Sequence, residues 1–157
     1  MKKILIAFTV LAAFSAAGVT LAQSTNVRDD AELLVSQIQT DSRAVVLAAM
    51  NMTDAEVLAF TPIYDKYQAE NKKLFSKMND LINKFAANYG SMTDDAAKDI
   101  MKDSFKLREE RAAVLKKYAK QMNRALPPTK VLQWVQIENK LNALLDAQAA
   151  AIIPLSR

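Results

Sequence analysis

The chain has 157 residues, with 21 Lys and Arg against 17 Asp and Glu, and it contains no His and no Cys. Without His and Cys, the usual nucleophile–base pairs are missing and transition metals lose their best ligands, so the composition predicts a protein that is not an enzyme and has no metal site and no cofactor. Two of the lysines stand at the N-terminus, and without them the net charge is about +2, too balanced to indicate a nucleic acid partner.

The N-terminal segment, residues 1–22, has the layout of a secretory signal peptide. Two lysines precede a long apolar run, and Thr20-Leu21-Ala22 places small residues at the −3 and −1 positions of a cleavage site. The alternative is an uncleaved membrane anchor, because the run is nearly long enough to span a bilayer. We expect cleavage after Ala22, which predicts a periplasmic protein without a transmembrane segment in its mature part.

The mature part, residues 23–157, has the length of a single domain and a composition typical of an all-α fold. Its only glycine is Gly90, whereas a β-rich domain needs glycine at many tight turns. Turn residues divide this part of the chain into four segments. The predicted helices span residues 29–50, 54–89, 94–126 and 128–153.

The second predicted helix begins with a strong start signal. Thr53 is a suitable N-cap, and Glu56 stands three residues later, so that the two residues complete a capping box. Met52 and Val57 flank them at the spacing of a hydrophobic staple. The helix is therefore expected to begin at residue 54.

A proline lies inside the second predicted helix. Apolar residues form a heptad-like seam from Val57 to Phe85, with one polar position at Asn71. Pro62 either kinks one continuous helix or marks a new helix capped by Thr61. We expect the kinked helix, because the seam keeps its phase across the proline.

The third predicted helix starts at Thr93 and carries a seam that includes Met101 and Phe105. Its second half holds a basic run, which either compensates the helix dipole or forms a positively charged face for acidic or unfolded protein segments and for membrane surfaces. The fourth predicted helix follows Pro127-Pro128 and stops before Pro154. The candidate partner-binding residues are those of the basic run: Arg108, Arg111, Lys116, Lys117, Lys120 and Arg124.

The lengths of these helices predict an elongated molecule. A helix of about 35 residues spans about 50 Å, and so short a chain cannot enclose such a rod in a deep core. We therefore expect the second and third helices to form a long antiparallel hairpin with the shorter helices packed along it. Such a shape leaves broad surfaces for a second copy of the chain or for another partner.

The residue pattern does not favour two other kinds of chemistry. Acidic residues are scattered along the helices beside Lys and Arg, which indicates solvated faces with local ion pairs rather than the paired carboxylates of a hydrolase. The six methionines of the mature part are spread over separate helices, which favours packing or partner contact over copper binding.

With these features the mature chain resembles the Spy/CpxP family of small helical periplasmic stress proteins, which carry two copies of an L-T-x-x-Q motif. Met52-Thr53-Asp54-Ala55-Glu56 stands where the first copy would be, with Met for Leu and Glu for Gln. Leu126-Pro127-Pro128-Thr129-Lys130 stands where the second would be and keeps only the Leu. The resemblance covers roughly residues 30–145. The metal-binding relatives use His or Cys, so that property is not carried over.

The resemblance implies a homodimer of helical hairpins that forms a curved cradle and binds unfolded or misfolded envelope proteins without ATP. The first hypothesis is therefore a periplasmic chaperone or envelope-stress adaptor that uses an apolar and basic helical surface. One alternative is a regulatory protein that binds the sensor domain of an envelope kinase. Another is a structural helical protein with no client activity.

Overall fold

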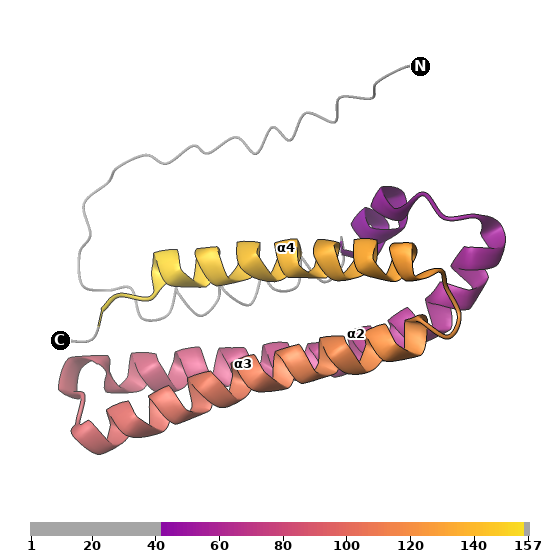
Figure 1. The fold of residues 1–157 in the computed structure, drawn as a ribbon. Helices are drawn as coiled ribbons and strands as arrows, with labels where there is room; N and C mark the ends of the chain where they lie inside the picture. The colour runs from indigo at the N-terminus through magenta and orange to yellow at the C-terminus, as the bar shows by residue number, and fades with distance from the viewer. Residues whose placement is uncertain (1–41, 156–157) are drawn as a thin grey trace, which may run out of the picture.

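The computed structural model describes residues 42–155, except for the side chain of Ile152, and this part of the chain is all-α (Figure 1). The predicted signal peptide and residues 29–41 of the first predicted helix lie outside the described residues. A short helix covers residues 42–50. The longer elements are α2 (Asp54–Asn88), the 3-10 turn η1 (Tyr89–Ser91), α3 (Asp94–Met122) and α4 (Pro128–Ile152).

The helices α2 and α3 form the long antiparallel pair that the sequence predicts, joined by η1 (Figure 1). The helix α4 returns along this pair, so that its C-terminal end lies toward the η1 end of the hairpin. We call the η1 end the distal end and the opposite end, where the 42–50 helix lies, the proximal end.

The start of α2 confirms the predicted capping box. The backbone N–H of Glu56 donates to Thr53 Oγ1 at 3.3 Å, and the backbone N–H of Thr53 donates to Glu56 Oε2 at 2.8 Å. The bond from the Thr53 backbone is the main reason why the pKa of Glu56 is lowered. The local sequence thus fixes where the hairpin begins.

The helix α2 runs on through Pro62, as the unbroken seam predicts. Its first turns are set at an angle to the rest of the helix (Figure 1), which is the expected effect of a proline that cannot donate to the carbonyl of Leu58. Leu58 itself is 76% exposed, so this side of the helix faces water, which can hydrate the freed carbonyl. The Thr61 hydroxyl donates to the Val57 carbonyl at 2.8 Å beside it.

The helix α3 ends at Met122, four residues before the predicted end. Leu126 precedes Pro127, and a residue before proline is disfavoured in the helical conformation. The backbone N–H groups of Ala125 and Leu126 both donate to the Met122 carbonyl, which tightens the chain into a turn. Leu126 is thereby directed into the core, where it is 5% exposed.

The main core lies at the proximal end, where the 42–50 helix, α2, α3 and α4 meet. Trp134 of α4 is fully buried and lies edge-on to Tyr67 of α2, with ring centroids 5.0 Å apart. Tyr118 of α3 contacts the same Tyr67 ring in a second edge-to-face pair at 5.7 Å. The buried residues of this proximal core are Val46, Met50, Phe60, Tyr64, Tyr67, Tyr118, Met122, Leu126, Val131 and Trp134.

The expected seam of α3 is wrong in its distal half. Met101 and Phe105 are 53% and 61% exposed, whereas Leu107 is 7% exposed and faces the hairpin. The seam spacing places Met101 and Phe105 on one side of α3, whereas within residues 42–155 the distal half of α3 packs against α2 and the end of α4. The inward side is therefore rotated away from these two residues.

The 42–50 helix is fastened to α4 at its C-terminal end. Lys130 Nζ donates to the carbonyls of Met50 at 2.6 Å and Asn51 at 2.8 Å, and Gln133 Nε2 donates to the Ala49 carbonyl at 2.9 Å. These are carbonyls of the last helical turn and of the residue after it, where a cation also complements the helix dipole. Asn51 then turns the chain with φ of 43°, a conformation that Asn tolerates.

We predict that Lys130→Met lowers the free energy of unfolding by about 1–2 kcal/mol, because two carbonyls lose a charged donor while most of the apolar stem is kept. Urea unfolding of the mature chain measures this loss. Lys140→Met, on an exposed position of the same helix, is the control and should change stability little. Equal losses in the two variants would contradict the assigned role of Lys130.

Candidate functional site

The six residues of the predicted basic site do not form one surface. Arg108, Lys116, Lys117 and Lys120 are exposed on α3, Arg124 is exposed in the turn after it, and Arg111 is partly buried. Lys117 is bound to Glu70 of α2 at 2.6 Å and lies over the Tyr118 ring, 5.1 Å from its centroid. Within residues 42–155, no ion pair involves Arg108, Lys116, Lys120 or Arg124.

Arg111 links α3 to α4 rather than facing solvent. Its side chain is 17% exposed, and its Nη1 donates to Asp146 Oδ1 at 2.8 Å. Its Nη2 donates to Asn142 Oδ1 at 2.7 Å. Asn142 and Asp146 lie one helical turn apart on α4, so the planar guanidinium spans both side chains. Arg111 therefore stabilises the contact between α3 and α4.

An apolar groove of about 420 Å³ lies at the distal end, between the hairpin and the last turns of α4. Ile82 and Phe85 of α2 and Ile100 of α3 form part of its apolar lining, and Ala150 lines it from α4. The main core does not extend this far, which leaves these apolar side chains beside an open space. We call this feature the distal groove.

Arg108 gives the distal groove a positively charged edge. It lines the groove from an exposed position on α3, and Arg111 and Asp146, which also line it, neutralise one another. Met101 stands two turns before Arg108 on the same side of α3, and Phe105 lies next to both on the helix surface. The apolar lining is thus continued on the outside of α3 by two exposed apolar side chains.

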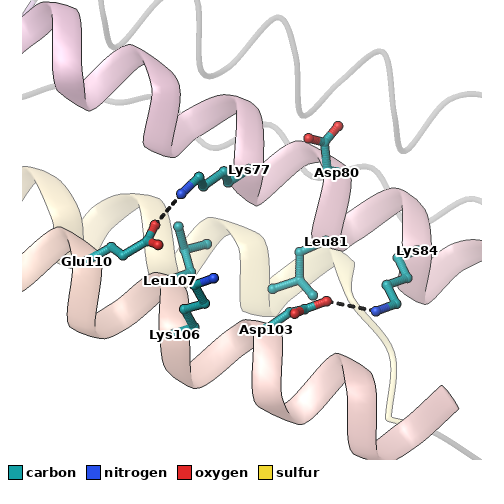
Figure 2. A pocket seen from close by; sticks show the side chains of 8 residues that line it. All are labelled: Lys77, Asp80, Leu81, Lys84, Asp103, Lys106, Leu107 and Glu110. Atoms are coloured by element: carbon teal, nitrogen blue, oxygen red, sulfur yellow. Dashed lines mark hydrogen bonds and ion pairs between the residues drawn. The ribbon is translucent and has the colours of Figure 1, made fainter. Parts of the chain in front are cut away.

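A second, charged cleft of about 230 Å³ lies between α2 and α3 (Figure 2). Two ion pairs cross it, Lys77 with Glu110 at 2.6 Å and Lys84 with Asp103 at 2.7 Å. The bond between Lys84 and Asp103 raises the pKa of Lys84 and lowers that of Asp103. Four of the six charged side chains that line this cleft are bound to one another, and only Asp80 and Lys106 lie outside the two ion pairs. The cleft therefore offers less to a ligand than the distal groove.

Leu81 and Leu107 line both the charged cleft and the distal groove. Figure 2 shows their side chains between the two ion pairs, Leu81 from α2 and Leu107 from α3. The distal hairpin is therefore one layer of side chains thick at this point. A partner in the groove would contact the leucines that separate it from the charged cleft.

The proximal core contains a buried carboxyl group that is not among the predicted site residues. Glu138 of α4 is 3% exposed, and it accepts hydrogen bonds from the Tyr67 hydroxyl at 2.8 Å and from Trp134 Nε1 at 3.1 Å. Burial raises the pKa of Glu138 to about 7, although both hydrogen bonds act to lower it. In the sequence, Glu138 stands four residues after Trp134 on the apolar side of α4. This spacing is the one sequence feature that indicates a buried contact between the two side chains.

Residues 42–155 contain no group of three or more His, Cys, Asp or Glu side chains placed to hold a metal ion. Over the same part of the chain, every helix is too short or too polar to cross a membrane.

Comparisons with known proteins do not add a family or a fold relative: scans against protein-family models, curated proteins and solved structures find no match to the chain. The Spy/CpxP resemblance stays a prediction that depends on the two degenerate motifs.

We predict that Arg111→Gln and Arg108→Gln differ in their effect on stability, although both remove one cation from the same stretch of α3. Arg111→Gln should lower the free energy of unfolding by about 1–2 kcal/mol, because Asp146 and Asn142 lose their donor. Arg108→Gln should change it by less than about 0.5 kcal/mol. Urea unfolding of both variants tests this, and a larger loss for Arg108→Gln would refute the assignment.

Proposed function

We propose that the protein is a periplasmic, ATP-independent chaperone or envelope-stress adaptor that binds unfolded protein segments in the distal groove. The observation that carries the proposal is an open apolar groove with a cationic edge, at the end of the hairpin that the main core does not reach. The predicted signal peptide supports the location, because a cleaved leader of this kind delivers the chain outside the cytoplasm.

The size of the groove suits a short apolar segment rather than a folded partner. A volume of about 420 Å³ is in the range of sites that accept small ligands, which corresponds to a few side chains of an unfolded chain. Burying apolar area is worth roughly 25 cal/mol per Å². A contact of this small size therefore gives weak binding. Weak binding allows a client to be released without ATP.

The lining of the groove suits clients of different sequence. Met78 lines it from α2, and Met101 stands beside it on α3. Methionine is unbranched and polarisable, which lets the same surface adapt to side chains of different shape. Phe105 adds an exposed aromatic ring next to the same edge. These residues would contact the client directly.

The exposed cations would act on the encounter rather than on the final contact. Arg108 lies at the groove itself, whereas Lys116 and Lys120 stand two and three turns further along α3. Charges at this distance attract acidic segments through water and are screened by salt. In the described part of the chain, the exposed, unpaired cations of the basic run on α3 therefore divide into Arg108 at the groove and the more remote steering residues Lys116 and Lys120.

Two alanines in the last turns of α4 give a matched test of the groove. Ala150 and Ala151 are both exposed, but only Ala150 lines the groove. A glutamate at either position meets the negative end of α4, so the cost to the helix is similar. In an aggregation assay with a denatured client, we predict that Ala150→Glu loses most of the suppression and that Ala151→Glu retains it.

The assay uses the mature chain, residues 23–157, at low and at high salt. Failure of the unaltered chain to suppress aggregation at several-fold molar excess would refute the chaperone proposal. Equal suppression by the two glutamate variants would refute the groove as the binding site. Suppression that salt does not change would show that the basic residues do not steer the encounter.

A further inference from the structure

The carboxyl group of Glu138 occupies an unusual position for a charged side chain. It lies in the proximal core, where the ring of Tyr67 packs against those of Tyr118 and Trp134. Its two oxygens face donors from two helices, the Tyr67 hydroxyl of α2 and the Trp134 indole of its own helix. A hydrogen-bonded carboxyl group thus joins α4 to the hairpin beside the contact between the Tyr67 and Trp134 rings.

The groups around this carboxyl are neutral at ordinary pH. From α2, Asn71 Nδ2 donates to the Tyr67 hydroxyl at 3.2 Å, and Gln68 and Tyr64 lie next to them. From the 42–50 helix, Ser42 lines the same small cavity, whose volume is about 10 Å³. Tyr118 closes the side toward α3. Tyr118 contributes only its ring, because its hydroxyl donates to Glu70 Oε1 at 3.0 Å. The polar groups facing the site are Tyr64, Tyr67, Gln68, Asn71, Ser42, Trp134 and Asn142.

The two arginines whose charges act on the neighbouring tyrosines, Arg111 on Tyr67 and Arg43 on Tyr64, have partners of their own. Arg111 of α3 is bound to Asn142 and Asp146, and Arg43 is bound to Asp65 at 3.1 Å. Neither donates a hydrogen bond to Glu138. Among residues 42–155, a carboxylate at this position therefore has no direct cationic partner of the kind that usually stabilises a buried charge.

We propose that Glu138 is a proton-operated latch, which takes up a proton when the surroundings become mildly acidic and thereby tightens the packing of α4 on the hairpin. The neutral carboxyl group avoids the cost of a buried charge, whereas the carboxylate carries that cost into the folded state. The proposal does not depend on the proposed chaperone function.

The sign of the effect follows from the two states of the chain. The pKa of Glu138 is about 7 when it is folded and near its usual 4.5 when the chain unfolds. Between these values the folded state holds a proton that the unfolded state has lost, so stability falls as the pH rises. From pH 5.5 to pH 8, this group alone should increase the unfolding equilibrium constant roughly 30-fold.

The effect of the latch extends along α4 toward the distal groove. Glu138, Asn142 and Asp146 follow one another at single-turn intervals on the side of α4 that faces the hairpin. Arg111 holds the last two, and Asp146 lines the groove. Glu138 therefore lies on the same side of α4 as the residues that line one wall of the groove. A change in the packing of Glu138 against the hairpin would be transmitted along this side of the helix.

The sequence makes this latch easy to observe. Trp134 is the only tryptophan, and it donates to Glu138 directly, so its fluorescence reports on the carboxyl group. The chain has no His and no Cys, and of the remaining ordinary groups only the α-amino terminus titrates near neutrality. A transition in the tryptophan emission between pH 5 and 9 can therefore be assigned to Glu138.

The experiment is a fluorescence pH titration of the mature chain, together with urea unfolding at pH 5.5 and pH 8. We expect an emission change with a midpoint near pH 7 and a loss of stability toward pH 8. In Glu138→Gln the emission change should disappear and the stability should become nearly independent of pH in this range. Glu109→Gln, an exposed glutamate on α3, is the control and should behave as the unaltered chain does.

A second variant keeps the test decisive if Glu138→Gln does not fold. Tyr67→Phe removes one donor to the carboxylate, so it should shift the midpoint to higher pH. A flat emission of the unaltered chain from pH 5 to 9 would overturn the proposal. A transition that persists in Glu138→Gln, or one that does not move in Tyr67→Phe, would overturn it as well.

Discussion

The packing of Trp134 against Tyr67 determines most of what this molecule can do. These two rings bring α4 onto α2, and Tyr118 brings α3 into the same contact. Truncation of a buried aromatic residue costs roughly 3–5 kcal/mol, so a few such residues supply much of the stability of a small domain. Because these aromatic contacts are concentrated at the proximal end, the distal end does not need to be closed for the chain to fold.

The sequence predicts the helices well where the signal is local. The capping box at Thr53 and Glu56, the continuous helix through Pro62 and the break at Pro127 all depend on a few neighbouring residues, and the structure agrees with each of them. The predicted end of α3 at residue 126 is wrong by four residues, because the turn that directs Leu126 into the core is stabilised by the tertiary packing of that side chain.

The candidate site was less predictable, because its features depend on which side of a helix faces a neighbour. Arg108 and Arg111 are only three residues apart in one basic run, yet Arg111 is bound by α4 and Arg108 is exposed at the groove. Met101 and Phe105 follow the seam spacing but remain exposed, since α3 packs against too few neighbours at its distal end. Periodicity along one helix cannot show where the next helix ends.

A buried glutamate in the most tightly packed part of the chain has a cost that an apolar residue would avoid. Replacing buried charges with well-packed apolar groups is often neutral or stabilising, so Glu138 is not explained by stability alone. Its hydrogen bonds to Tyr67 and Trp134 do, however, require one relative placement of α2 and α4. A leucine at the same position would make neither hydrogen bond, so the placement of α4 would then depend on the packing of the aromatic rings alone. The carboxyl group thus gives the open distal end a defined geometry, by fixing at the proximal end the helix from which the groove is built.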